Sequence, residues 1–303
     1  MRVLLKGNWQ GCHCGSAAVW GRIRQLVEER SDLQLIRDNG LDWLRGENYE
    51  CLIINGEGTM HDNARGAIRM LEQAKAVKRS GRQVHLINSV WQNMTAPEIE
   101  IVKELDSVFV RESISFSHIE PLYPHAKIAT DLSYDMPVKI SGEKGALFRR
   151  EDSPTKAVGG FFVPHNLKWP REEYTRLSIR NYIGGAKTHS GGPNQHLAPP
   201  RGAGKPSKWE DYLNALSGAS LLITGLHHEV LAACKLRIPF VAYRGNTDKV
   251  LGIIQRAKVD IPVASNPNEL KNNIKKLPPI DQYEKLFDFL ADQKPFTLEH
   301  LGI

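Results

Sequence analysis

The sequence has few of the features that mark secreted or membrane proteins. It contains only four cysteines in 303 residues, at positions 12, 14, 51 and 234, which is too few for a disulfide framework in a chain of this length. No apolar run reaches the roughly 20 residues that a membrane-spanning helix needs, and the first residues show no organisation of a cleavable signal. We therefore expect no transmembrane segment, reduced thiols and a cytoplasmic location.

A strong charge of one sign is also lacking. Lys and Arg number 40 and Asp and Glu 34, which gives a net charge of +6. This mild excess suits an anionic substrate, a nucleic acid or a membrane surface, and equally an ordinary, slightly basic cytosolic protein. With 41% hydrophobic residues the chain is globular rather than disordered, and its length favours two domains over one core.

Short apolar runs alternate with segments of helical periodicity. In the first half the expected strands are residues 2–6, 33–37, 51–55, 84–88, 107–112 and 127–131, and residues 96–106 are one of the expected helices. This alternation predicts right-handed βαβ units and a mainly parallel sheet. The pattern breaks near 136–157 and returns with strands at 220–225, 238–243 and 261–265. The sequence therefore predicts an α/β fold of two Rossmann-like domains that face each other across a cleft.

The predicted domain boundary follows from that break. We expect an N-terminal, acceptor-side domain over 1–140 and a C-terminal, donor-side domain over 141–303, whose last helix packs back on the first domain. The second domain begins with a strand at either 146–150 or 158–164. Residues 184–208 are rich in Gly, Pro, His and Lys, and this stretch is long enough to be a functional or a disordered loop rather than a simple connector.

Ligands of open α/β sheets bind beyond the carboxyl ends of the strands, so residues at these ends are the site candidates in the first half. Glu57 is expected to be a general base or to orient a hydroxyl, and Asp131 to share its edge of the sheet as a second catalytic carboxylate. In each case a purely structural role is the alternative. The first turn would simply need glycine, Glu57 would be a solvated carboxylate, and Arg111 and Asp131 would form an ion pair at the rim. The remaining acceptor-side candidates are Gly7, Asn8, Gly11, His13, Ser16, Asn55, Gly56, Gly58, Thr59 and Arg111.

Three cofactor motifs fail on spacing. The first glycine turn does not follow G-x-G-x-x-G, so a dinucleotide is not indicated. The pair of cysteines around His13 has no second pair of ligands at zinc spacing. Residues 202–207 resemble the end of a P-loop, but Pro206 stands where Ser or Thr is needed. We expect no metal and no cofactor.

The turn after the strand at 220–225 carries the clearest constellation. Two adjacent histidines open a helix there, where the helix N-terminus adds partial positive charge and an imidazole can donate a proton or bind phosphate. Basic and polar residues follow the next strand as well. Together they predict a pocket for an anionic donor, formed by Gly225, His227, His228, Glu229, Tyr243, Asn246 and Lys249, with His228 as the catalytic residue.

Five segments, taken in order, resemble a known family. They are RVLLKGN at 2–8, INGEGT at 54–59, VFVRESIS at 108–115, ATDLSYDM at 129–136 and the long block from 222 to 255. Their order and spacing resemble the polysaccharide pyruvyl transferases. The resemblance implies a GT-B-like fold and transfer of a pyruvyl ketal from phosphoenolpyruvate onto a sugar hydroxyl of a glycan, in polysaccharide biosynthesis.

The resemblance also implies roles for single residues. His228 matches the family histidine, a general acid or donor contact, and Lys249 matches the family lysine. Arg149 or Arg150 would match the arginine that holds the donor's carboxylate or phosphate.

Two positions depart from the family pattern, and they leave other functions open. Leu226 stands at the donor-site arginine, and Ser16 lies near a missing acidic residue. A GT-B glycosyltransferase with a nucleotide-sugar donor is therefore the alternative, with Glu229 on a ribose diol. Its acceptor would be a glycan or another anionic polymer such as nucleic acid. A binding protein without catalytic activity is the third hypothesis.

Overall fold

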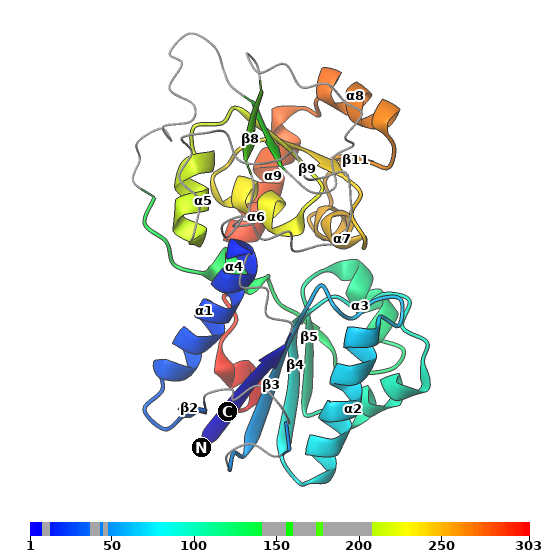
Figure 1. The fold of residues 1–303 in the computed structure, drawn as a ribbon. Helices are drawn as coiled ribbons and strands as arrows, with labels where there is room; N and C mark the ends of the chain where they lie inside the picture. Colours follow the sequence, from blue (N-terminus) through cyan, green and yellow to red (C-terminus); the bar gives the residue numbers. More distant parts are fainter. Residues whose placement is uncertain (8–12, 37–42, 45–47, 141–155, 160–173, 178–207) are drawn as a thin grey trace, which may run out of the picture. The chain divides into compact units, whose positions relative to one another are not determined.

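The chain forms two compact units in the computed structural model, which describes residues 1–7, 13–36, 43–44, 48–140, 156–159, 174–177 and 208–303 (Figure 1). Unit 1 comprises Met1–Trp9, Val19–Asp135 and Lys294–Ile303. Unit 2 comprises Gln10–Ala18 and Met136–Gln293. The first turn of the first helix thus groups with unit 2, and the last segment of the chain groups with unit 1.

Unit 1 contains a six-stranded sheet in the order β2-β1-β3-β4-β5-β6, in which every neighbouring pair is parallel. The strands are β1 Arg2–Gly7, β2 Gln34–Ile36, β3 Cys51–Glu57, β4 Gln83–Ser89, β5 Ser107–Val110 and β6 Lys127–Ile128. The helices before and between them are α1 Cys14–Glu28, α2 Arg65–Arg79, the 3-10 helix η1 Pro97–Glu104, α3 Ser113–Ile119 and α4 Leu132–Asp135.

Alternate residues of these strands build two cores on opposite faces of the sheet, because side chains of a strand point in turn to either face. Leu52 and Ile54 of β3 pack in one core with residues of α2 and η1. Ile53, between them, packs in the other with residues of α1 and of the C-terminal segment. Since both faces are covered, β3 is buried along its whole length, which explains its nearly continuous apolar sequence.

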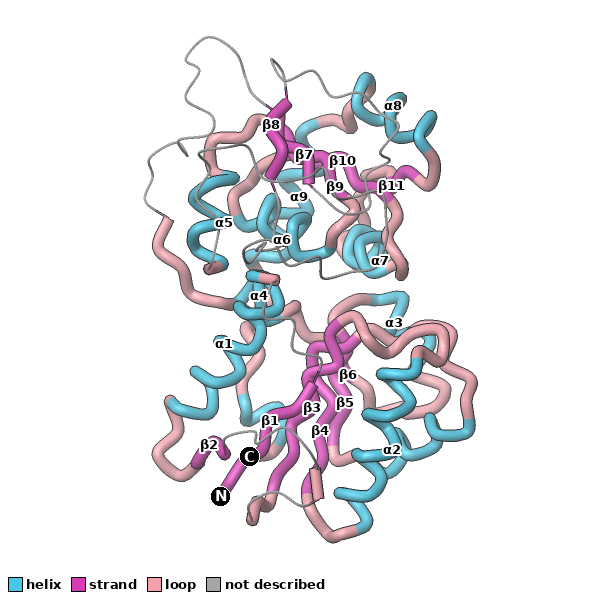
Figure 2. Tube along the Cα trace, in the orientation of Figure 1, coloured by secondary structure: helices cyan, strands magenta, loops and turns pink. Residues whose placement is uncertain are grey.

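Unit 2 contains a five-stranded parallel sheet in the order β11-β10-β9-β7-β8 (Figure 2). Its strands are β7 Lys156–Gly159, β8 Tyr174–Leu177, β9 Leu221–Thr224, β10 Phe240–Tyr243 and β11 Val263–Ala264. Its helices are α5 Trp209–Leu216, α6 His227–Lys235, α7 Lys249–Arg256, α8 Pro267–Lys275 and α9 Ile280–Ala291, and a 3-10 helix, η4 Leu298–Leu301, ends the chain in unit 1.

These sheets confirm the predicted α/β class with two Rossmann-like parallel-sheet units. One element differs from the sequence-based expectation, since the segment expected as a helix at 96–106 is the 3-10 helix η1. The candidate strand at 146–150 and almost all of the glycine-rich stretch 184–208 lie outside the described residues. Among the helices formed by described residues, none has the length and apolar character to cross a membrane.

Candidate functional site

Polar side chains tie together the carboxyl ends of β3, β4 and β6 in unit 1. Asn55, on β3, is fully buried. The Asn88 side chain, on β4, donates through Nδ2 to Asn55 Oδ1 at 3.3 Å and accepts through Oδ1 from the Leu132 amide at 3.1 Å. Asn88 therefore links two strand ends to the turn that follows β6. Asn88 is not among the predicted site residues, although it follows a buried apolar run just as Asn55 does.

Arg111 and Asp131 form an ion pair at this edge of the sheet. Arg111 Nη1 lies 2.6 Å from Asp131 Oδ2, and the two side chains are only 2% and 1% exposed. Asp131 Oδ1 accepts from the amide and the hydroxyl of Ser133 at 2.9 and 2.7 Å. Both carboxylate oxygens thus have partners that hold the turn into α4. The structure brings these two predicted residues together in the interior rather than at a rim.

Glu57 ends β3 in a strained backbone conformation. Its φ is +43°, and Asn88 at the end of the neighbouring strand has φ +53°. Left-handed backbone at residues other than glycine costs about 1 kcal/mol or more and is typical of functional sites. The Glu57 carbonyl accepts from the Val90 amide at 2.7 Å, which helps to hold the turn. The residue is buried, with 6% exposed, so a buried carboxylate stands where the sequence predicted a catalytic group.

Two glycines allow the strand ends to approach one another. A Cβ on Gly7 would lie 2.4 Å from the Asn55 carbonyl oxygen, and one on Gly56 would lie 2.4 Å from Ser89 Oγ. Beyond them, the Thr59 amide donates to the Gly56 carbonyl at 3.0 Å and closes the turn that contains Gly58. The predicted contacts at positions 8 and 11 lie outside the described residues.

In unit 2 the turn between β9 and α6 is fixed by a hydroxyl and a carboxylate. Thr224 Oγ1 accepts from the Leu226 amide at 2.9 Å and donates to Glu229 Oε2. Leu226 is the N-cap of α6 and its own side chain makes no capping bond, so Thr224 binds the N-cap amide in its place and Glu229 in turn holds the Thr224 hydroxyl. Glu229 is 0% exposed, and a Cβ on Gly159 would overlap its carboxylate. The structure thus places Glu229 inside the core.

Three imidazoles gather at the first turns of α1 and α6. The His228 ring centroid lies 5.1 Å from that of His13 and 5.6 Å from that of His227. All three residues are buried, with exposed fractions of 7%, 7% and 3% for His13, His228 and His227. A Cβ on Gly15, in the first turn of α1, would lie 2.6 Å from His228 Cγ. Two helix N-termini therefore meet at these rings, which we call the imidazole cluster.

His13 and Ser16, which the sequence analysis assigned to the acceptor side, belong to this part of unit 2. The His13 carbonyl accepts from the Ala17 amide at 2.9 Å, and its Nδ1 accepts from the Ser16 amide at 3.2 Å. These two bonds make His13 the N-cap of α1. The predicted residues at 149 and 150 lie outside the described residues.

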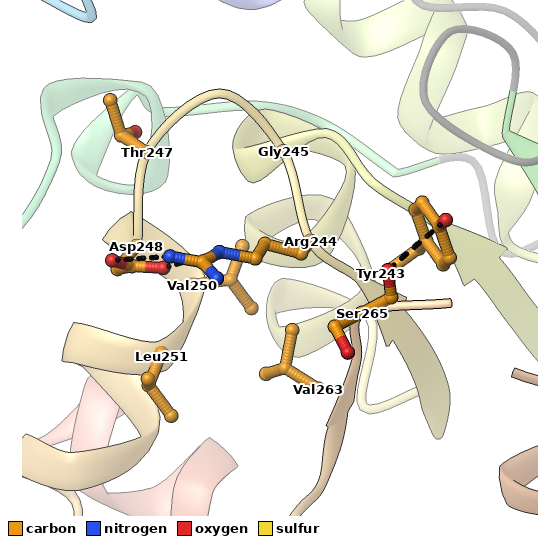
Figure 3. A pocket seen from close by; sticks show the side chains of 9 residues that line it. All are labelled: Tyr243, Arg244, Gly245, Thr247, Asp248, Val250, Leu251, Val263 and Ser265. Atoms are coloured by element: carbon orange, nitrogen blue, oxygen red, sulfur yellow. Dashed lines mark hydrogen bonds and ion pairs between the residues drawn. The ribbon is translucent and has the colours of Figure 1, made fainter. Parts of the chain in front are cut away.

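A pocket of about 240 Å³ lies at the ends of β10 and β11 (Figure 3). Arg244 reaches across its loop to Asp248, with Nε 3.0 Å from Oδ1 and Nη2 3.2 Å from Oδ2. Thr247 Oγ1 is buried and has no hydrogen-bond partner among the described residues. The pocket is lined by Tyr243, Arg244, Gly245, Thr247, Asp248, Val250, Leu251, Val263 and Ser265.

The predicted residues around the pocket are held by local bonds. The Tyr243 hydroxyl donates to the Ser265 carbonyl at 3.4 Å. Lys249 Nζ donates to Asn246 Oδ1 at 3.0 Å. Both bonds fix the rim of the loop that leads from β10 into α7.

Two further titratable groups lie beside Glu229. Burial and, next, the charge of Glu229 raise the pKa of the Cys14 thiol. The same two causes raise the pKa of the Tyr212 hydroxyl well above its usual value. Both groups stay protonated at neutral pH, so Cys14 is not a thiolate nucleophile. Among the described residues, no group of three His, Cys, Asp or Glu side chains is arranged to hold a metal ion.

Comparisons with known proteins identify the fold. No protein-family model matches the chain, and no curated protein matches it. MnaA from S. aureus, solved as a co-structure with UDP, is similar with a TM-score of 0.60 and 10% identity, over 95% of this chain and 90% of that one. The UDP-GlcNAc 2-epimerase from Neisseria meningitidis bound to UDP-GlcNAc gives 0.55 and 12%, over 94% of each chain.

A third solved structure, the glycotransferase of kitacinnamycin, gives a TM-score of 0.53 at 9% identity, over 99% of this chain and 95% of that one. At sequence identities this low, the structural similarity shows a shared fold. The chain therefore has the GT-B-like α/β fold of these proteins along nearly its whole length.

Proposed function

We propose that this chain is a group-transfer enzyme that acts on sugars and binds an anionic donor in unit 2. The observation that carries the proposal is the imidazole cluster at the meeting N-termini of α1 and α6. Each helix N-terminus carries about half a positive charge, and the first amides of a helix bind anions directly. Two such ends beside three imidazoles suit a phosphate or diphosphate group.

A nucleotide sugar is the donor that we favour. The pocket lies at the ends of β10, which is the neighbour of β9, and of β11, which is the next strand beyond β10. Neighbouring strands lie only about 4.8 Å apart. A diphosphate held at the start of α6 could therefore extend a nucleoside or sugar into this pocket, where Arg244 and Thr247 offer polar atoms. The fold likeness to proteins solved with UDP and UDP-GlcNAc supports the same choice.

Pyruvyl transfer from phosphoenolpyruvate is the second candidate. The order of the sequence segments around His228 and Lys249 supports it. Leu226 weighs against it, because this residue is an apolar, 8% exposed N-cap where the family pattern has an anion-binding guanidinium. An apolar side chain cannot make the two hydrogen bonds by which an Arg holds an anion, so it does not take over that function.

In the proposed reaction a general base takes the proton from a sugar hydroxyl of the acceptor glycan. The hydroxyl oxygen forms a bond to the anomeric carbon of the donor, and the bond from that carbon to the diphosphate breaks. The diphosphate leaves with the electron pair, and the imidazole cluster and helix ends stabilise its charge. Within unit 1, Glu57 is a carboxylate on a strained, buried turn, which is the chemistry that a general base needs.

Thermal unfolding with candidate ligands tests the proposal. A ligand at 100 times its Kd stabilises the native protein by about 2.7 kcal/mol, which raises Tm by roughly 4 °C for a chain of 303 residues. We expect this shift with UDP or a UDP-sugar, and none with His228→Asn. The matched control is His118→Asn, which removes an exposed imidazole from α3 and should bind normally.

Two outcomes would contradict the proposal in different ways. A shift with phosphoenolpyruvate and none with any nucleotide would replace the nucleotide-sugar donor by the second candidate. No shift with nucleotides, phosphoenolpyruvate or pyrophosphate would remove the anionic donor altogether.

A further inference from the structure

We infer that the outer face of α2 is a docking surface for an acidic acceptor glycan, a polysaccharide that carries negative charge at repeated positions. The inference rests on the proposed function, since it names the class of acceptor that the enzyme uses. The surface consists of four basic residues of this helix, which we call the α2 cations: Arg65, Arg69, Lys75 and Arg79. The three arginines are exposed and Lys75 is partly exposed.

The charge of α2 is mostly of one sign and mostly unpaired. Glu72 is the only acidic residue of the helix. Lys78, a fifth basic residue, forms an ion pair with Asp106 at 2.7 Å. The α2 cations form no ion pair with any side chain in the described part of the chain, although η1, which packs against α2, carries Glu98 and Glu104. The positive charge of this face is therefore available to a partner.

The α2 cations form a stripe along one side of the helix. Arg65 and Arg69 are neighbours on the helix surface, because residues four positions apart lie about one turn apart. The other two cations repeat this interval towards the C-terminus of the helix. At 1.5 Å per residue the stripe is roughly 21 Å long, which is too long for one small anion and suits a polymer. The opposite side of the helix is buried and consists of Ala67, Leu71, Ala74 and Val77.

Helix stability does not explain the first two cations. The N-terminus of a helix carries partial positive charge and favours acidic residues, yet α2 begins with Arg65 and has no acidic residue in its first turn. By contrast, α5 has Glu210 and Asp211 in its first turn, and α8 has Glu269. A negatively charged partner would make the basic start of α2 favourable.

The stripe begins at the edge of the sheet where unit 1 holds its buried carboxylate. β3 ends at Glu57, and α2 follows it after the turn of residues 58–64. From there α2 runs along the face of the sheet that carries Leu52 and Ile54 (Figure 1). An acceptor chain whose end sugar reaches the Glu57 edge would therefore meet Arg65 first and the other α2 cations further along.

The composition of the stripe favours an acidic glycan over a nucleic acid. Three of the α2 cations are arginines, whose guanidinium groups bind carboxylates through two parallel hydrogen bonds. Proteins that bind single-stranded nucleic acid also stack the bases on aromatic side chains, and α2 has no aromatic residue.

The variant Arg65→Gln/Arg69→Gln/Arg79→Gln of the full chain tests the docking surface. The probes are polygalacturonate, neutral dextran of similar length and single-stranded DNA. We expect the wild type to bind polygalacturonate most tightly, with an affinity that falls as salt is added. Three exposed ion pairs, each worth about twofold in affinity, multiply to roughly tenfold, so the Kd of the variant should rise by about tenfold. Its Tm should be unchanged or higher, because a cation is lost from the helix N-terminus.

The matched control is Lys271→Gln/Lys275→Gln/Lys276→Gln, which removes three exposed cations on and beside α8. It changes the net charge by the same amount and should leave the Kd for polygalacturonate unchanged. An equal loss in both variants would overturn the inference, since only the net charge would matter. Equal binding of dextran would also overturn it, as would tighter binding of DNA that depends on the α2 cations.

The thermal shift with UDP separates this inference from the proposed function. Both triple variants should keep the shift of the wild type. A shift with UDP in a protein that does not bind polygalacturonate would refute the docking surface alone. The absence of a shift with nucleotides, phosphoenolpyruvate and pyrophosphate would refute the proposed function, whatever polygalacturonate does.

Discussion

His85 should make the protein lose stability in mild acid. It lies on β4, is 1% exposed and shares a hydrogen bond between Nδ1 and Ser107 Oγ at 2.9 Å. Burial is the main cause that lowers its pKa from 6.5 to about 4. The charge of Asp106 raises the pKa by less, and the charge of Lys78 lowers it slightly further. The unfolded chain therefore binds a proton between pH 6.5 and 4 that the native chain does not bind.

The sign and the size of the effect follow from linkage. Since the unfolded state holds more protons in this window, its free energy falls relative to the native state as the pH drops. Each factor of ten in proton affinity is worth about 1.4 kcal/mol, so the full effect of the lowered pKa is about 3 kcal/mol. Stability is fully present above pH 6.5 and is lost progressively toward pH 4.

Urea unfolding of wild type and His85→Gln from pH 7.5 to 4 measures this effect. Gln retains a polar side chain of similar size but does not titrate. The comparison therefore uses the pH dependence of the free energy of unfolding, and not its absolute value in the variant. Asp106 also has a lowered pKa: burial raises it, and the bonds from Lys78 and from the Val84 amide outweigh that effect. The Asp106 carboxylate keeps these bonds in both proteins, so its own titration contributes little to the difference. The difference between the two curves should change by about 3 kcal/mol. Parallel curves between pH 6.5 and 4 would refute the reasoning.

Two further predictions concern packing and reactivity. Gly15→Ala should lower the urea midpoint and weaken UDP binding, because its Cβ would lie 2.6 Å from His228 Cγ. Gly66→Ala in α2 should instead raise the free energy of unfolding by about 0.5–1 kcal/mol, because the new methyl group meets only a methyl carbon at 3.6 Å. Equal changes in stability for the two Gly→Ala variants would contradict the packing argument. Burial raises the pKa of three thiols, one of them to about 12, so peptide mapping should find no alkylation at pH 8 without denaturant at Cys14, Cys51 and Cys234.

The sheet strands could be predicted from the sequence because a strand covered on both faces consists of a nearly continuous run of apolar residues. The segment at 51–55 is the clearest case, and β3 is buried throughout. The helix expected at 96–106 is present, but its 3-10 type could not be predicted. Its apolar residues Ile101 and Val102 are buried, so the pattern reports which side packs but does not distinguish a 3-10 from an α-helix.

The site was predictable where it depends on strand ends and not where it depends on backbone geometry or distant contacts. His228 stands out because it follows a buried strand and opens a helix. The left-handed conformations of Glu57 and Asn88 leave no trace in the sequence, since neither is glycine. The spatial neighbours of His13 could not be predicted, because local patterns place it in the first βα unit while its ring contacts His228, which is distant in the sequence.

Unit 1 is built from segments near both ends of the chain, so it cannot be completed until the last segment has been synthesised. Phe296, Leu298 and Leu301 belong to the same core as Phe109 and the first strand, and the Phe296 amide donates to Asp135 at 3.2 Å. The ribosome makes these residues after the whole of unit 2. Unit 1 must therefore wait with an apolar face uncovered while unit 2, which contains none of them, can fold. Until the last segment is made, this face of unit 1 exposes apolar side chains, and such exposed surface is prone to aggregation.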